Sequence, residues 1–233
     1  ALMEKSGVDH LVLVPFTADF ASMEAEAYIS DFLVRFFHPH TVIIGHDHRF
    51  GKNRSGDFQL MKSCGNKYGF QVLEIPEYVI NNIGISSTTI RKKLNSGDIA
   101  EANELLGYQY SFTGTVIKGN QMGRTIGFPT ANLAIDDILK LIPYNGVYGV
   151  QVLLENGEEH IGMMNIGVRP TVDDATITHI EVHLFDFAQE IYNQKIRVSL
   201  VVRVRDEQKF IHVEALQNQL AQDEIFIRSF FSI

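Results

Sequence analysis

The sequence has little cysteine, a deficit of basic residues and no long apolar run. Its one cysteine, Cys64, excludes a disulfide within the chain and suits a reducing compartment, so we expect a cytoplasmic protein. Lys and Arg number 20 against 28 Asp and Glu, a net charge of −8, which disfavours binding to nucleic acid or an anionic membrane. No segment approaches the roughly 18 apolar residues of a membrane-spanning helix. We therefore expect small-molecule ligands as partners, and the oligomeric state stays open.

The chain is long enough for two domains, and its pattern changes near Gly107–Tyr108. In the first part, apolar runs at 10–16, 41–45 and 70–75 alternate with helical patterns such as 57–68, which indicates an open α/β sheet. The second part has strand patterns without intervening helices, typical of an antiparallel barrel or sandwich, and then a helical pattern. Those strands are expected at 110–117, 147–154, 159–165, 177–185 and 196–204, and the helix at 213–230.

A glycine-rich segment, 118–127, follows the first of these strands. Gly119, Gly123 and Gly127 would let the backbone approach an anion closely, and Arg124 adds positive charge. The segment does not match the GxxxxGK[ST] phosphate loop. A flexible hairpin loop is the alternative interpretation.

Thr130 and Asn132 stand two residues apart directly after this segment. In an extended backbone both side chains point to the same face, and their oxygens are hard ligands that suit Mg²⁺ beside substrate phosphates. A local turn in which these side chains satisfy the backbone is the alternative.

The segment 177–187 alternates between an apolar face and a polar face that carries Glu181. A carboxylate in the middle of a strand could accept the proton of an attacking hydroxyl in phosphoryl transfer. An ordinary solvated strand face explains the same pattern.

Two motifs stand out in the first part. Ser86, Ser87 and Thr88 begin a helical pattern that includes Arg91, which makes either an anion site or a plain helix cap. The loop 45–51 follows a strand at the position where α/β folds bind ligands. His46 and His48 lie in this loop, but no further ligands for a metal such as zinc are evident.

Five blocks of the second part resemble the riboflavin kinase module. The resemblance implies a six-stranded antiparallel flavokinase barrel with a C-terminal helix over 108–233, with Mg²⁺, ATP and riboflavin as cofactor and substrates. It also implies that Thr130 and Asn132 bind the metal, that Glu181 is the catalytic base and that 118–127 covers the phosphates. Arg169 and Arg205 lie in matching blocks and are expected on the flavin side. The blocks are 123–133, 145–150, 165–171, 180–187 and 205–210.

The first part resembles the FMN adenylyltransferase module of the bacterial bifunctional riboflavin kinase/FAD synthetase family. The resemblance implies nucleotide-binding roles for Asp47, Phe50 and Gly51 and for Ser86, Ser87, Thr88 and Arg91. The H-x-G-H motif of that module is absent from the sequence. We therefore expect residues 1–107 to form an N-terminally incomplete Rossmann-like nucleotidyltransferase domain, and these 233 residues alone to make FMN without measurable FAD.

The resulting prediction is ATP-dependent phosphorylation of riboflavin to FMN, with adenylylation of FMN to FAD in the complete protein. A flavin- or nucleotide-binding module without catalysis is the alternative.

Overall fold

The computed structural model describes residues 2–77, 79–80, 83–119, 121–170 and 176–233. The chain forms two compact units, Ala1–Val79 and Ile80–Ile233, and each is described by itself. Within the described residues, the helices are too short or too polar to cross a membrane.

The first unit has a parallel pair of strands packed against helices. Strand β1 (Thr41–Gly45) pairs with β2 (Gln71–Ile75), and α5 (Phe58–Tyr68) connects them. The Asp57 side chain accepts the N–H of Leu60 at 2.9 Å at the start of α5, and Gly69 ends the helix in the left-handed region at φ +83°. The predicted strand–helix–strand unit is thus confirmed. The other helical segments are α1 (Leu2–Lys5), α2 (Ala18–Ala21), α3 (Ala25–Ala27), the π-helical η1 (Tyr28–Val34), α4 (Arg35–Phe37) and the 3-10 helix η2 (Lys52–Arg54).

The strand predicted at 10–16 is wrong. These residues form no strand, and Leu11, Leu13 and Phe16 are 60%, 83% and 80% exposed. Local apolar sequence predicts a strand only where a neighbouring strand accepts its backbone groups. Among the described residues of this unit, β1 and β2 pair only with each other.

The boundary between the units falls within a short strand, and the second unit continues with a second short strand and two helices. Strands β3 (Val79–Ile80) and β4 (Ile83–Gly84) pair where the units divide in sequence, and α6 (Ser87–Ser96) and α7 (Ile99–Leu106) follow. Leu94, Ile99 and Ala102 of these helices are buried in the same core as the barrel strands. This packing explains why the compact units divide before the change of sequence pattern at Gly107–Tyr108.

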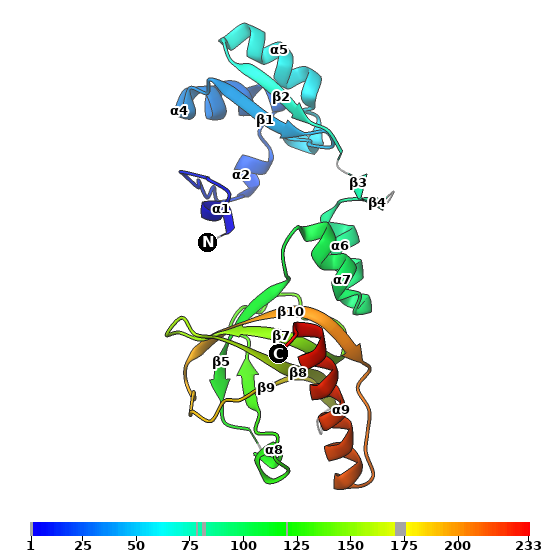
Figure 1. Cartoon of the computed structure of the whole chain (residues 1–233). Coiled ribbons are helices and arrows are strands. Elements are labelled where there is room, and N and C mark those ends of the chain that lie inside the picture. The colour runs from blue at the N-terminus through cyan, green and yellow to red at the C-terminus, as the bar shows by residue number, and fades with distance from the viewer. Residues whose placement is uncertain (1, 78, 81–82, 120, 171–175) are drawn as a thin grey trace. The chain divides into compact units, whose positions relative to one another are not determined.

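The body of this unit is a closed antiparallel barrel with the strand order β10-β5-β6-β9-β8-β7 (Figure 1). The strand alternation predicted from the sequence is confirmed, with apolar residues such as Ile180, Val182 and Leu184 buried inside. The four-residue strand β6 was not recognised from periodicity alone. The strands are β5 (Ser111–Ile117), β6 (Ala131–Ala134), β7 (Gly146–Leu153), β8 (Glu159–Pro170), β9 (Thr176–Leu184) and β10 (Lys195–Arg205).

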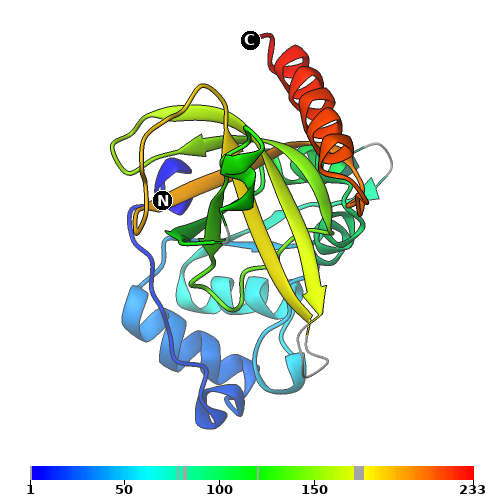
Figure 2. The same cartoon turned by 90° about the horizontal axis from the view of Figure 1, so that it is seen from below.

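Besides α6 and α7, the helical elements α8 (Met122–Thr125) and α9 (Val213–Phe231) lie outside the barrel (Figures 1 and 2). Ile227 of α9 is fully buried against Met163 of β8 and Phe185, which follows β9. Gln217 of α9 donates its side-chain N–H to the carbonyl of Ile126 at 3.2 Å. Helix α9 therefore covers part of the outer barrel face and contacts the glycine-rich segment.

Candidate active site

The candidate site lies on the outer face of the barrel. Asn132 of β6 is directly opposite Glu181 of β9, and Glu181 is directly opposite Asn165 of β8. Directly opposed residues of antiparallel strands point to the same side, with Cβ atoms about 4.5–5.5 Å apart. Since the neighbours Ile180 and Val182 point into the core, the three polar side chains form a row on the outside.

Thr130 completes this row just before β6. Its hydroxyl donates to Oε2 of Glu181 at 3.3 Å. Thr130, Asn132 and Glu181 line one pocket, so the structure brings together the three residues predicted for metal binding and proton transfer. All three are partly exposed, which leaves them accessible to a ligand.

The glycine-rich segment packs directly on these residues. A methyl group at Gly119 would overlap the side-chain amide of Asn132, and one at Gly123 would overlap the carbonyl of Phe128. Gly127 has φ +87°, a backbone conformation that favours glycine. The N–H groups of Ile126 and of Phe128, the residue after the segment, both donate to the carbonyl of Gly123. The glycines thus allow the segment to fold back onto Asn132 and Thr130.

Two pockets meet at Thr130. The helix pocket has a volume of about 240 Å³ and is walled by α9 and the segment 205–210. The loop pocket has a volume of about 400 Å³ and is walled by the segment 187–192. The helix pocket is lined by Gln121, Met122, Gly123, Ile126, Phe128, Thr130, Asn132, Val147, Met163, Met164, Asn165, Glu181, His183, Arg205, Glu207, Gln208, Phe210, Leu216 and Leu220. The loop pocket is lined by Val116, Arg124, Pro129, Thr130, Ala131, Val182, Leu184, Phe187, Ala188, Gln189, Glu190, Ile191 and Tyr192.

Weak polar contacts link the glycine-rich segment to the far wall of the loop pocket. The Arg124 guanidinium lies 3.9 Å from the carboxylate of Glu190, and both side chains are well exposed. Gln121 donates to the hydroxyl of Tyr192 at 3.3 Å. Exposed pairs of this kind contribute little free energy, so a ligand anion could replace Glu190 as the partner of Arg124 at small cost.

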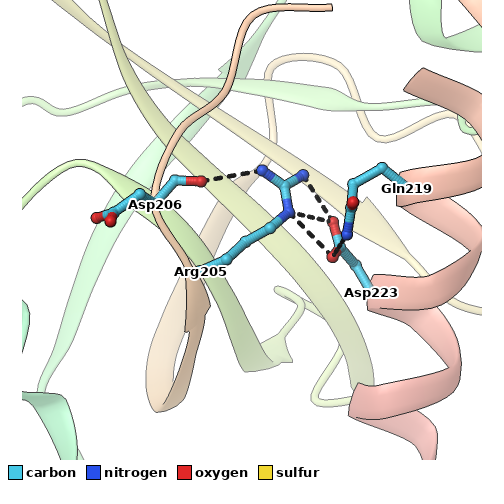
Figure 3. A network of polar contacts seen from close by, with 4 residues as sticks. All are labelled: Arg205, Asp206, Gln219 and Asp223. Atoms are coloured by element: carbon cyan, nitrogen blue, oxygen red, sulfur yellow. Dashed lines mark hydrogen bonds and ion pairs between the residues drawn. The ribbon is translucent and has the colours of Figure 1, made fainter. Parts of the chain in front are cut away.

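Arg205 lines the helix pocket, but its guanidinium is held by α9 (Figure 3). Its Nε lies 3.0 Å from both carboxylate oxygens of Asp223, and its Nη2 donates to Oδ2 at 2.7 Å. Gln219 donates to the same carboxylate at 2.9 Å, and Nη1 of Arg205 donates to the carbonyl of Asp206. Asp223 is only 2% exposed, so the pair anchors α9 to the end of β10. The flavin-binding role of Arg205 stays a prediction.

Three of these residues were not recognised as important from the sequence. Asn165 lies opposite Glu181 only because of the barrel register, which local patterns do not encode. His183 was assigned to a polar strand face, yet it is buried. For Asp223 a signal was available, because an acid falls on the apolar stripe formed by Leu220 and Ile227.

Arg169 is in β8 opposite Ile177, and its side chain lies outside the described part of the structure. Its predicted place on the flavin side is therefore still a prediction.

The residues predicted for adenylyl transfer fall in different units. In the first unit Asp47 is exposed in the turn after β1, and Phe50 is 7% exposed in the core. A methyl group at Gly51 would lie 2.5 Å from Cα and 2.8 Å from the backbone N of Ala25. Phe50 and Gly51 therefore also contribute to packing.

His46 and His48 have no third metal ligand beside them in the described structure. The described residues contain no group of three or more His, Cys, Asp or Glu side chains that could hold a metal ion.

In the second unit Ser86 caps α6, because its hydroxyl accepts the N–H of Thr89 at 3.1 Å. Ser87, Thr88 and Arg91 are in the first turns of α6. Ser87 and Arg91 are exposed, and so is Thr88. The helix-cap interpretation is confirmed, and the predicted anion-binding role remains untested.

Comparison with known proteins identifies the class to which this barrel and its polar row belong. Residues 106–231 match the family model described as riboflavin kinase, and residues 1–89 match the model described as FAD synthetase. The chain belongs to the bifunctional riboflavin kinase/FMN adenylyltransferase family.

Curated relatives and a solved structure agree with this assignment. The chain is 38% identical over 231 residues to the bifunctional riboflavin kinase/FMN adenylyltransferase of Escherichia coli strain K12, covering 99% of this chain and 73% of the relative. It is 40% identical over 231 residues to the protein of the same name from Listeria monocytogenes, covering 99% and 72%. A Streptococcus pneumoniae crystal structure titled as a macrolide-efflux protein superposes with a TM-score of 0.89 at 33% identity, covering 97% of this chain and 72% of that one.

Proposed function

We propose that the second unit transfers the γ-phosphoryl group of ATP to riboflavin to give FMN, and that the chain carries FMN adenylyltransferase residues in both units. The observation that carries the kinase proposal is the position of Thr130, whose hydroxyl contacts Glu181 and which lines both pockets. Family membership supports catalysis over a module that only binds flavin or nucleotide. We also infer a cytoplasmic location from the use of ATP and the single cysteine.

The two pockets suit the two substrates. The helix pocket is lined by Met, Phe, Ile and Leu side chains, with Glu181 and Asn165 at one side, which fits a flat apolar ring system with a polar chain. The loop pocket has Arg124 at its rim and leads to the glycine-rich segment, which fits a nucleotide with its phosphates. In this arrangement the ribityl 5′-hydroxyl and the γ-phosphate meet beside Thr130.

The donor set at this junction fits magnesium. Thr130 Oγ1 and Asn132 Oδ1 are neutral hard oxygens on one side of an extended segment, and Gly119 leaves the room in which Asn132 lies. We propose that these two residues hold the ion. When bound, Mg²⁺ supplies charge that offsets the negative charge of the β- and γ-phosphates.

Glu181 is proposed as the general base. Its carboxylate accepts the proton of the ribityl 5′-hydroxyl as that oxygen bonds to the γ-phosphorus. The bond between the γ-phosphorus and the bridging oxygen breaks, and ADP leaves. The hydrogen bond from Thr130 keeps the carboxylate oriented toward the junction of the pockets. Arg124 and the backbone of 119–127 are proposed to position the phosphates.

Two isosteric substitutions test the metal assignment. Thr130→Val removes the hydroxyl, and Asn132→Leu removes the amide oxygen, at nearly constant volume. We expect each to raise the Mg²⁺ concentration for half-maximal FMN formation about tenfold or more, with riboflavin binding changed little. Chromatography of FMN formed from riboflavin and ATP over a Mg²⁺ titration measures the effect.

Thr113→Val is the matched control, because Thr113 is exposed on β5 and lines neither pocket. It should leave the Mg²⁺ dependence as in the native protein. An unchanged Mg²⁺ requirement in both Thr130→Val and Asn132→Leu would remove these residues from the metal site.

A further inference from the structure

His183 makes a buried contact beside the proposed site. It lies on β9 two residues after Glu181 and is 9% exposed. Its Nδ1 atom lies 2.7 Å from the carbonyl oxygen of Pro129. That carbonyl belongs to the peptide group that joins Pro129 to Thr130. His183 is therefore hydrogen-bonded to the peptide group that immediately precedes Thr130, the proposed metal ligand.

The chemistry of the contact fixes its direction. A carbonyl oxygen only accepts hydrogen bonds, so Nδ1 of His183 must carry the proton and donate it. A short bond of this kind in a buried place is costly to leave unmade, because the Pro129 carbonyl would lose its partner. The tautomer of His183 with its proton on Nδ1 is therefore the one that this contact requires.

The surroundings hold the histidine ring in place. The ring meets Phe128 and Phe185 edge to face, with centroids 5.4 and 5.8 Å away. A methyl group at Gly162 would overlap the His183 carbonyl, so β8 approaches the backbone of His183 closely. The two phenylalanine rings and the close approach of β8 limit how far the ring and its backbone can follow a displaced Pro129.

The peptide group after Pro129 controls where Thr130 points. Proline fixes its own φ, so the orientation of this peptide depends on ψ of Pro129 and φ of Thr130. Holding the carbonyl oxygen restricts both angles together. The Thr130 hydroxyl is then directed to Glu181 and to the junction of the pockets.

We propose that His183 is a positioning residue for riboflavin phosphorylation, because its Nδ1–H orients the Pro129–Thr130 peptide and with it the Thr130 hydroxyl toward the Mg-nucleotide. This inference rests on the proposed function of Thr130. His183 also lines the helix pocket, but the role proposed here acts through the Pro129 carbonyl and Thr130.

Two substitutions of nearly equal size separate the hydrogen bond from packing. In His183→Asn, the side-chain amide nitrogen lies about where Nδ1 of the histidine lies, and it can donate to the Pro129 carbonyl. The leucine of His183→Leu has as many side-chain heavy atoms as asparagine but no hydrogen-bond donor. We expect His183→Leu to weaken binding of MgADP about tenfold, and His183→Asn to stay within about threefold of the native protein. Calorimetric titration with MgADP measures this. Flavin fluorescence measures riboflavin binding, which should agree within about twofold between the two variants, because both replace a side chain that lines the helix pocket.

His179→Leu is the matched control on the same strand. His179 lies on β9 two residues before Glu181, and it lines neither pocket. MgADP should bind this variant as it binds the native protein. Nitrogen-15 NMR of the native protein without ligand should show a proton on Nδ1 of His183.

The outcomes distinguish this inference from the proposed function. Equal MgADP affinity in His183→Leu and His183→Asn would overturn the positioning role, and so would a difference in riboflavin binding between the two variants as large as their difference in MgADP binding. Thr130→Val is titrated in parallel. If Thr130→Val binds MgADP like the native protein, the proposed role of Thr130 fails; if it binds weakly while His183→Leu binds normally, only the role of His183 fails.

Discussion

Replacing Glu181 with glutamine is expected to lower the rate of FMN formation by ~10²-fold or more, since a general base typically contributes 10²–10⁴-fold. Glutamine keeps the size of the side chain and can still accept the Thr130 hydrogen bond, which spans 3.3 Å in the native protein. It cannot take the proton of the ribityl hydroxyl. Binding of riboflavin and of MgADP should change little, so the loss should appear in kcat. Steady-state FMN formation together with the two binding titrations checks this.

Glu159→Gln provides the same chemical change on the neighbouring strand β8. Glu159 is exposed and lines neither pocket, so this variant should retain the native kcat. A Glu181→Gln protein that turns over at the rate of Glu159→Gln would reduce Glu181 to a polar residue of the strand surface.

Replacing Asp223 with alanine is expected to cost about 3–5 kcal/mol of unfolding free energy, because it leaves the Arg205 guanidinium without its buried carboxylate. The side chain of Arg205 is 14% exposed and that of Asp223 only 2%, so water replaces the lost partner poorly. The loss should also weaken riboflavin binding, since Leu216 and Leu220 of α9 line the helix pocket. Urea unfolding followed by the near-ultraviolet circular dichroism of the tyrosines measures the stability.

Asp186→Ala removes a second carboxylate that contacts α9, through Arg228. Hydrogen bonds from Arg228 lower the pKa of Asp186, but its side chain is 79% exposed. This variant should therefore lose much less stability than Asp223→Ala. The double variant Arg205→Met, Asp223→Leu removes both buried charges and should recover much of the loss. If Asp223→Ala is no less stable than Asp186→Ala, the buried pair does not anchor α9.

Much of the barrel could be predicted because its strands alternate strictly. The opposite faces of the segment 177–187 were assigned from period two alone, and Ile180, Val182 and Leu184 are indeed inside. Helix ends were equally clear where capping residues stand, as at Ser86 and Gly107. These features depend on a few neighbouring residues, and local sequence therefore determines them.

Features that depend on distant packing could not be predicted. His183 belongs to the polar face of its strand, yet Phe128 and Phe185 contact its ring and bury it. The row of Asn132, Glu181 and Asn165 needs the register of three strands. The apolar run 10–16 was predicted as a strand but does not form one. Its composition favours a strand, but no described strand pairs with it. In each case a contact between segments far apart in sequence decides the outcome.

The most direct test of the account follows the phosphoryl group itself. Native protein is incubated with riboflavin, Mg²⁺ and ATP labelled at the γ-phosphate, and the flavins are separated by chromatography. The account predicts label in FMN for the native protein and, over the same time, about a hundredth of that amount or less for Glu181→Gln. Riboflavin binding without labelled FMN in the native protein, or equal labelling by Glu181→Gln, would contradict it.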